Sequence, residues 1–342
     1  MPFRDIIGHE RPKAILRAAM LHDHVAHAYL FYGEDRIGKR LTAIRFAQAI
    51  NCDTDYGPDS PEACGVCRSC HQIETRIHPD FLLIEPDREQ ANPQIKIEQI
   101  RELESQIIYR PLVGRRKICI IDEADRLTLG AANALLKPLE EPPAQSLFLL
   151  VTSRPYALPA TVRSRCQGLR FAAPARTQVE AALILKREIP PTDARFLAMM
   201  TQARIGQALQ TDLEATRAQQ DDFSALTSTK SLKSITTLLT AAETLVRANR
   251  APEALEWIAR WVRDLVLVHI GADPDNLLNF DRLPALKETA CGMPLDALLD
   301  LLDDIEAIQR NATRNLNLQM ALETVLLRLR DAISVPAQPH SV

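Results

Sequence analysis

The chain has 342 residues, of which 46% are apolar, 25% are charged and only 5% are aromatic. This length predicts two or three domains, and the low aromatic content favours a helical protein over a β-sandwich. A net charge of −3 argues against a largely basic nucleic-acid-binding surface, although a local basic patch stays open. No apolar stretch approaches the roughly 18 residues of a membrane span, and the N-terminal residues show no signal-peptide pattern, so we expect a cytoplasmic protein with no membrane partner.

Residues 27–40 have the order of strand, glycine-containing loop and helix that a phosphate-binding loop requires. The loop reads GEDRIGK and places Gly33, Gly38 and Lys39 at the spacing G-x-x-x-x-G-K. Glycines allow backbone N–H groups to approach phosphate oxygens, and the lysine and the helix N-terminus add positive charge. The next residue is Arg40, where a Ser or Thr hydroxyl would bind Mg²⁺. The loop therefore has the form of an ATPase site without the chemistry of a competent one.

Residues 52–70 form a polar, cysteine-rich segment that interrupts the alternation of strands and helices. Its two overlapping C-x-x-C steps, with one cysteine twelve residues earlier, can form a tetrahedral thiolate site for Zn²⁺. The four cysteines are Cys52, Cys64, Cys67 and Cys70. Four unrelated reduced cysteines are the alternative, but unliganded cysteine prefers apolar surroundings, which this segment lacks. We predict a structural zinc, because four thiolates leave no open coordination position for catalysis.

The rest of the first half alternates short apolar runs with helical patterns. Apolar runs at residues 81–84, 117–121 and 147–151 indicate buried strands, and residues 97–107 repeat isoleucine and leucine at helical spacing. Alternation of this kind predicts an α/β fold, with a parallel sheet covered by helices on both faces.

Two acids, Asp122 and Glu123, follow the predicted strand at residues 117–121. In ATPases with a phosphate-binding loop, a Mg²⁺-binding aspartate and a water-activating glutamate belong at this position. Acids also cap helices, so the four-residue DEAD match gains weight only together with the glycine loop. These patterns predict a degenerate site that would hold ATP or ADP weakly, through Gly33, Gly38, Lys39, Asp122, Glu123 and Thr152.

Strand patterns are absent from the second half. Residues 173–222 read as short helices and residues 223–335 as long amphipathic helices, which predicts a small helical domain followed by a larger one. Residues 336–342 are expected to be a disordered tail. Trp257 and Trp261 lie four residues apart on one predicted helix, where core packing is the simpler interpretation and a subunit interface is the alternative.

Arg165 lies in the run TVRSRCQ, after the strand predicted at residues 147–151. Taken alone, an arginine in a loop is most simply a solvated surface charge. The chain, however, also contains the runs GEDRIGKR, GRRKICIIDEADRLT, NALLKPLEEPP and FLLVTSRP, in that order and with the cysteine segment inserted. With these motifs the sequence resembles the clamp-loader branch of the AAA+ ATPases, and the resemblance covers nearly the whole chain.

This resemblance implies an AAA+ domain at residues 1–172, a helical lid at 173–222 and a helical collar at 223–335 that packs a five-subunit ring. It implies partners of the gamma/tau motor type and the delta type in a hetero-pentamer, and, through that complex, a sliding clamp and primer-template DNA. It also implies that Arg165 points into the ATP site of a neighbouring subunit, where it would stabilise charge on the γ-phosphate.

Departures from the family pattern weaken the chain's own nucleotide site. Arg40 replaces the Mg²⁺-binding hydroxyl, and Gln207 stands where a working motor has an arginine in its second sensor motif. We therefore expect a replication subunit without intrinsic ATPase activity that supplies Arg165 in trans. Two alternatives stay open. One is an ATP-hydrolysing motor subunit, and the other is a zinc-dependent DNA-binding module, which the acids around the cysteines disfavour.

Overall fold

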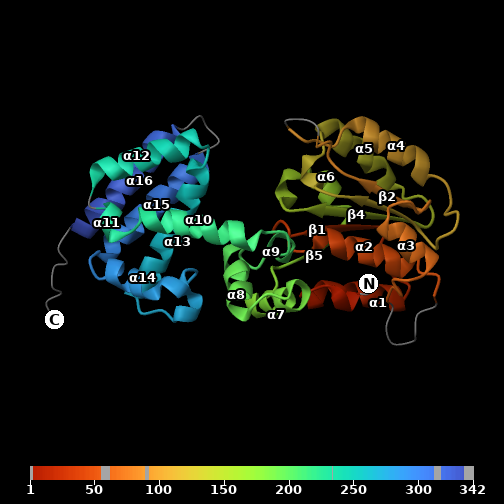
Figure 1. The fold of residues 1–342 in the computed structure, drawn as a ribbon. Helices are drawn as coiled ribbons and strands as arrows, with labels where there is room; N and C mark the ends of the chain where they lie inside the picture. The colour runs from red at the N-terminus through yellow and green to blue at the C-terminus, as the bar shows by residue number, and fades with distance from the viewer. Residues whose placement is uncertain (1–2, 55–61, 89–91, 233, 312–316, 335–342) are drawn as a thin grey trace. The chain divides into compact units, whose positions relative to one another are not determined.

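The computed structural model describes residues 3–54, 62–88, 92–232, 234–311 and 317–334 (Figure 1). The chain forms two compact units, Met1–Gln210 and Thr211–Val342. The tail predicted at residues 336–342 lies outside the described residues. No helix in the described ranges is long and apolar enough to cross a membrane.

The first unit is built on a five-stranded parallel sheet, in the order β2-β3-β4-β1-β5. Its strands are β1 (Ala28–Tyr32), β2 (Phe81–Ile84), β3 (Lys117–Ile121), β4 (Ser146–Thr152) and β5 (Gln167–Arg170). Every residue of β3 and β4 is buried, which explains why both strands read as continuous apolar runs in the sequence. The parallel sheet predicted from the sequence is confirmed.

Helices cover both faces of this sheet (Figure 1). Neighbouring strand residues point to opposite faces, so Ile118 of β3 joins the buried cluster that contains Phe46, and Cys119 joins the cluster that contains Leu103 and Leu135. The helices that follow one another along the chain are α1 (Glu10–Leu21), α2 (Lys39–Ile50), α3 (Arg68–Glu74), α4 (Ile97–Ile107), α5 (Leu129–Glu140) and α6 (Ala160–Arg163). Three more complete the unit: α7 (Arg176–Arg187), α8 (Pro191–Met200) and α9 (Ile205–Ala208). The predicted α/β architecture is therefore present.

The described part of the second unit is helical. Its helices are α10 (Leu213–Leu226), α11 (Thr229–Leu232), α12 (Ile235–Arg247), α13 (Ala251–His269), α14 (Leu283–Ala290), α15 (Leu295–Asn311) and α16 (Leu318–Ser334). Trp257 and Trp261 of α13 are both buried in the core, with ring centroids 5.4 Å apart and planes 19° apart. Since α10 runs through residue 222, the finer division into lid and collar stays a prediction.

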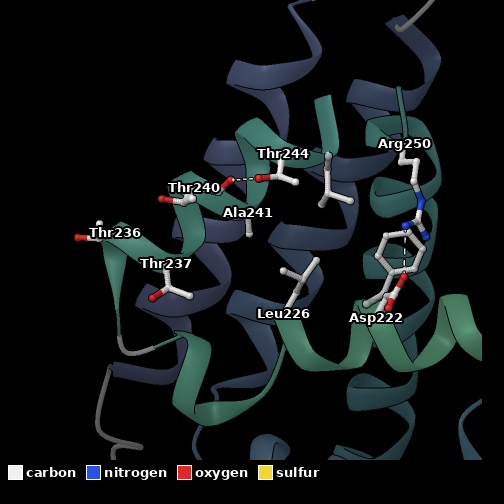
Figure 2. A pocket seen from close by; sticks show the side chains of 10 residues that line it. Asp222, Leu226, Thr236, Thr237, Thr240, Ala241, Thr244 and Arg250 are labelled. Atoms are coloured by element: carbon white, nitrogen blue, oxygen red, sulfur yellow. Dashed lines mark hydrogen bonds and ion pairs between the residues drawn. The ribbon is translucent and has the colours of Figure 1, made fainter. Parts of the chain in front are cut away.

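A groove of about 560 Å³ separates α10 from α12 in this second unit (Figure 2). Threonines of α12 line one side of it, and Thr244 Oγ1 donates to the carbonyl oxygen of Thr240 at 2.8 Å. On the other side, the Arg250 guanidinium lies 5.1 Å from the ring centroid of Phe223 and pairs with Asp222 at 3.2 Å. The groove is thus lined by threonine hydroxyls of α12 and by a partly exposed ion pair between Asp222 and Arg250.

Candidate functional site

The loop between β1 and α2 has a backbone shape that its two glycines allow. Gly33 has φ 150° and Gly38 has φ 110°, values that residues with a Cβ rarely adopt. A Cβ added to Gly33 would also lie 2.1 Å from the carbonyl oxygen of Phe171. Because α2 begins at Lys39, its first N–H groups, which lack partners within the helix, lie at this loop. The loop thus has a backbone shape that requires glycine at Gly33 and favours it at Gly38, and it lies at the N-terminus of α2.

The loop lysine is directed into the loop itself. Lys39 is only 5% exposed, and its Nζ donates to the carbonyl oxygen of Gly33 at 2.9 Å and to that of Glu34. Burial lowers the pKa of Lys39, while nearby acids such as Asp35 and Asp122 act in the opposite direction. Main-chain oxygens therefore satisfy the ammonium group within the chain.

Arg40, the residue that departs from the ATPase pattern, bridges two carboxylates. Its Nη1 lies 2.5 Å from Glu85 Oε1 and 3.1 Å from Asp122 Oδ2. Burial raises the pKa of Asp122, and the Arg40 guanidinium acts to lower it. A Mg²⁺ ion would need oxygen ligands at this place, yet the guanidinium already pairs with the acid and repels a second cation. The structure therefore shows a resident cation beside Asp122.

Glu123, the second acid of the pair, faces two other arginines. Its backbone is left-handed, with φ 48°, and its carboxylate lies 2.6 Å from Arg88 Nη2 and 2.5 Å from Arg126 Nε. A glutamate that activates water must keep an oxygen available for that water. Here both carboxylate oxygens already face a guanidinium.

Thr152, at the end of β4, is bonded to a third acid. Its Oγ1 donates to Asp125 Oδ1 at 2.7 Å, and Arg154 Nη2 lies 2.8 Å from Oδ2 of the same carboxylate. Burial alone raises the pKa of Asp125, but the hydrogen bonds from Thr152 and Arg154 outweigh burial, and the net pKa is lowered. Thr152 thus belongs to a local hydrogen-bonded cluster.

A cleft of about 580 Å³ lies at the loop and brings most of the predicted nucleotide residues together. Those that line it are Gly38, Lys39, Arg40, Asp122 and Glu123. Among the residues that the structure describes, the lining of this cleft does not include Gly33 or Thr152. Gly206 of α9 forms another wall, and its N–H donates to the carbonyl oxygen of Arg36 at 2.9 Å. Gln207 is the next residue of the same short helix.

The four predicted metal ligands converge on one point. All four sulfurs lie within 4.8 Å of one another, with Cys52 Sγ 3.8 Å from Cys67 Sγ and 3.7 Å from Cys70 Sγ. Four sulfurs placed ~2.3 Å from a tetrahedral centre are about 3.8 Å apart, so the spacing fits a tetrahedral ion. The Cys67 N–H also donates to Cys64 Sγ at 3.2 Å, the kind of outer contact that supports thiolate ligands. Residues 55–61 of this segment lie outside the described residues. The cluster can hold a metal ion.

Arg165 lies away from these groups, just after α6. Its Nη1 donates to the carbonyl oxygen of Thr161 at 2.8 Å, and its Nη2 lies 2.6 Å from Glu140 Oε1. About a third of the side chain is exposed. Burial raises the pKa of the neighbouring Cys166 thiol to about 12, so this cysteine stays a neutral packing residue.

Sequence reasoning missed the partners that hold these side chains in place. They are Glu85 for Arg40, Arg88 and Arg126 for Glu123, and Glu140 for Arg165. Only Glu85 carried a usable signal, because it follows the predicted strand at residues 81–84 directly. The carboxyl ends of parallel strands meet at one edge of a sheet, where such a residue can reach Arg40.

The structure also reveals an exposed apolar loop that the sequence pattern did not indicate. Residues 108–114 follow α4, and four large apolar residues of this loop are each at least 67% exposed: Ile108, Tyr109, Leu112 and Val113. The buried carboxylate of Asp80 accepts the N–H groups of Leu112, Val113 and Gly114, each at 2.8 Å. An apolar surface held in a fixed shape is suited to contact with another protein.

Two family models match the chain, and both are described as DNA polymerase III, delta subunit. The first matches residues 8–175, and the second, for the C-terminal part of that subunit, matches residues 207–331. The chain belongs to this family. Membership in the DNA polymerase III delta-subunit family agrees with the resemblance to clamp-loader subunits drawn from the motifs.

Individual relatives carry related names. The DNA polymerase III subunit delta' of Pseudomonas aeruginosa is 36% identical over 172 residues, which are 50% of this chain and 50% of that protein. The delta' subunit of Bacillus subtilis is 37% identical over 191 residues, or 56% of this chain and 55% of that protein. The tau subunit of Salmonella typhimurium is 34% identical over 285 residues, which are 78% of this chain and 43% of tau. The chain thus spans about half the length of these curated relatives.

Among solved structures, a DNA polymerase III gamma-subunit-related protein from Thermotoga maritima aligns over 95% of this chain and 99% of that chain. The two share 18% sequence identity, with a TM-score of 0.49.

Proposed function

We propose that the chain is a delta-prime-like subunit of the clamp loader of DNA polymerase III, which assists in placing the sliding clamp on DNA without hydrolysing ATP itself. One observation carries this proposal: the Arg40 guanidinium occupies the space beside Asp122 in which a hydrolytic site needs Mg²⁺. The pairing of Glu123 with Arg88 and Arg126 supports the same conclusion. Phosphoryl transfer by P-loop enzymes depends on the metal ion and a positioned nucleophile.

The same proposal gives Arg165 its role. In the complex, Arg165 would enter the ATP site of an adjacent motor subunit and stabilise charge on the transferred phosphoryl group. Its partial exposure and its position on a loop at the surface support this assignment. The expected partners are gamma/tau-type and delta-type subunits in a hetero-pentamer, with the sliding clamp and primer-template DNA contacted through that complex.

The test is the DNA-stimulated ATPase activity of the complex, assembled from this chain and its candidate partner subunits. Arg165→Ala should leave assembly intact and slow hydrolysis by about 10³-fold at the ATP site that Arg165 serves, because an arginine finger contributes 10³ or more to this reaction. Lys39→Ala should leave hydrolysis unchanged. Unchanged activity in Arg165→Ala would overturn the proposal, and so would ATP hydrolysis by the isolated chain that Lys39→Ala abolishes.

We also propose that the four-cysteine cluster binds a structural zinc ion. The sulfur spacing fits a tetrahedral ion, and the four thiolates would fill its coordination. The ion would fix a chain excursion between α2 and α3 that has little core of its own. The acids in this segment, such as Asp53 and Glu62, make a DNA-binding role unfavourable.

Metal analysis of the purified chain, followed by chelation, tests the zinc proposal. We expect one zinc per chain, and chelation should increase amide hydrogen exchange at residues 62–78 while β1 and β4 keep their protection. Cys64→Ser should lower the zinc content, whereas Cys291→Ser, a change at an exposed cysteine in the other unit, should not. A chain purified without zinc would refute the proposal, and global unfolding on chelation would show that the ion does more than fix one segment.

The retained cradle favours one secondary activity, which is weak binding of ATP or ADP. The loop glycines, Lys39 and the cleft of about 580 Å³ could hold phosphates without a metal ion. Isothermal titration of the isolated chain with ADP, with and without Mg²⁺, tests this. We expect ADP to bind with the same affinity with and without Mg²⁺. A titration that shows no heat of binding would contradict this activity and indicate that the loop is purely structural.

A further inference from the structure

Arg165 is held by three contacts. Its Nη1 donates to the carbonyl oxygen of Thr161 in α6 and, at 3.4 Å, to Ser164 Oγ, and its Nη2 pairs with Glu140 at the last residue of α5. A guanidinium has five N–H donors in a fixed plane. These contacts use two donors on Nη1 and one on Nη2, and leave one on Nη2 and one on Nε for a phosphate oxygen. The side chain is thus held in one direction while some of its N–H donors stay available.

Helix stability does not explain why an acid stands at position 140. The C-terminal end of a helix carries partial negative charge, so a carboxylate there is unfavourable for the helix by itself. Glu140 is half exposed, and exposed ion pairs contribute little to folding. Glu140 therefore adds little to the stability of the fold. What the contact does is fix one long, flexible side chain in one direction.

We infer that Glu140 is a positioning residue for Arg165, and this inference rests on the proposed function of Arg165 in trans. A free arginine side chain has several rotatable bonds and loses much of their freedom when it enters a site. The ion pair with Glu140 restricts the guanidinium before the neighbouring subunit arrives. Thr161 contributes only its backbone and the contact with the Ser164 hydroxyl is long, at 3.4 Å, so Glu140 is the charged side chain that provides most of this restriction.

The experiment compares clamp-loader complexes that contain Glu140→Gln, Glu140→Asp or Arg165→Ala in this subunit. Glu140→Gln keeps the shape of the side chain but removes its charge, and we expect kcat for DNA-stimulated ATP hydrolysis at the served site to fall by between about 10-fold and 100-fold. The KM for ATP and the assembly of the complex should change little. Glu140→Asp, which keeps the charge, should restore part of the lost rate.

The matched control is Glu141→Gln, because Glu141 is the adjacent, exposed acid just beyond α5. It should leave kcat at the wild-type value. A double variant, Glu140→Gln with Arg165→Ala, should be no slower than Arg165→Ala alone, since Glu140 acts only through Arg165.

The outcomes separate the inference from the proposed function. If Arg165→Ala has full activity, the proposed function fails. If Arg165→Ala is slow but Glu140→Gln keeps the wild-type kcat, the proposed function stands and the positioning role is overturned. A Glu140→Gln complex that is faster than wild type would also overturn it, because the contact would then restrain Arg165 rather than orient it.

Discussion

Two arginines of the first unit form ion pairs that differ in how far the acid is buried. In the cleft, Arg40 pairs with a mostly buried aspartate, Asp122, whose side chain is 11% exposed. On the loop after α6, Arg165 pairs with Glu140, whose side chain is 50% exposed. The cost of breaking an ion pair rises steeply with burial. The cleft pair is therefore fixed, whereas the guanidinium of Arg165 stays accessible to a second anion beside Glu140.

Under the proposed function, this difference means that the loop and cleft are kept while the chemistry takes place in another subunit. In the cleft, Arg40 pairs with Glu85 and Asp122, and these contacts hold α2 near the ends of β2 and β3. The cleft would then serve as architecture. The loop after α6 would keep a cation available to a partner subunit.

The largest stability effect that this comparison predicts concerns the loop backbone. Gly33→Ala should destabilise the chain by about 3 kcal/mol or more, because the new Cβ would meet the Phe171 carbonyl at 2.1 Å and the backbone would have to move. Gly38→Ala is the control: Gly38 also has a positive φ, but a Cβ there would lie 3.5 Å from His9 Nε2, its nearest neighbour outside the loop and helix backbone, so a smaller loss is expected. Urea unfolding curves measure both, and equal stability of Gly33→Ala and wild type would show that the loop is not a packed part of the architecture.

A smaller effect is expected from removal of the resident cation. Arg40→Ser supplies the hydroxyl but leaves Asp122 without its arginine partner and Glu85 with Arg76 alone, which should cost about 2 kcal/mol of stability, less than a fully buried pair would lose. The isolated variant should still fail to hydrolyse ATP in a phosphate-release assay, because Glu123 stays paired with two arginines. Arg36→Ser, which removes an exposed arginine of the same loop, is the matched control. Hydrolysis by Arg40→Ser would break the comparison, because Arg40 alone would then silence the site.

The smallest effect concerns the pH dependence of Asp125. The pKa of Asp125 in the folded chain lies below its ordinary value of 3.8. Its ionised form therefore adds stability at pH values above 3.8, and this stability is lost as the pH falls through the pKa of the folded chain. Asp125→Asn should therefore be less stable by about 1 kcal/mol at pH 7, and the gap should narrow below pH 3.8.

Asp122 gives the opposite trend, because burial raises its folded pKa. As the pH falls toward that pKa, the wild type should gain stability relative to Asp122→Asn. Unfolding free energies of both variants, measured from pH 7 down to about pH 3, test the pair. Parallel trends for the two variants would contradict the assigned environments.

The sequence predicts the fold well where a pattern repeats along the chain. Continuous apolar runs located β3 and β4, and the C-x-x-C steps located the cysteine cluster, because strand burial and metal ligation both impose local spacing. The mismatch of Arg40 with a metal site was also visible, since it needs only the charge of one residue. The ion pairs that Arg40 forms with Glu85 and Asp122 were not visible in the sequence.

The missing information lies in contacts between segments far apart in the sequence. Glu85 meets Arg40 because β2 and β3 end at the same edge, and Glu140 meets Arg165 because α5 and α6 lie together. Neither contact can be recognised from a regular spacing of residues in the sequence. Glu123 was expected to face the nucleotide, but its left-handed backbone and its two arginine partners depend on local geometry that its residue type does not specify.

The contact between Gly206 and Arg36 has a consequence for the mobility of the loop. The bond joins main-chain atoms, and the absence of a Cβ at Gly206 allows the approach, since an added Cβ would lie 2.8 Å from the Arg36 oxygen. Because only backbone atoms take part, a change in the side chain of Arg36 would leave the bond in place. The loop and α9 are therefore coupled, and a displacement of the loop at Arg36 would be passed on to α9.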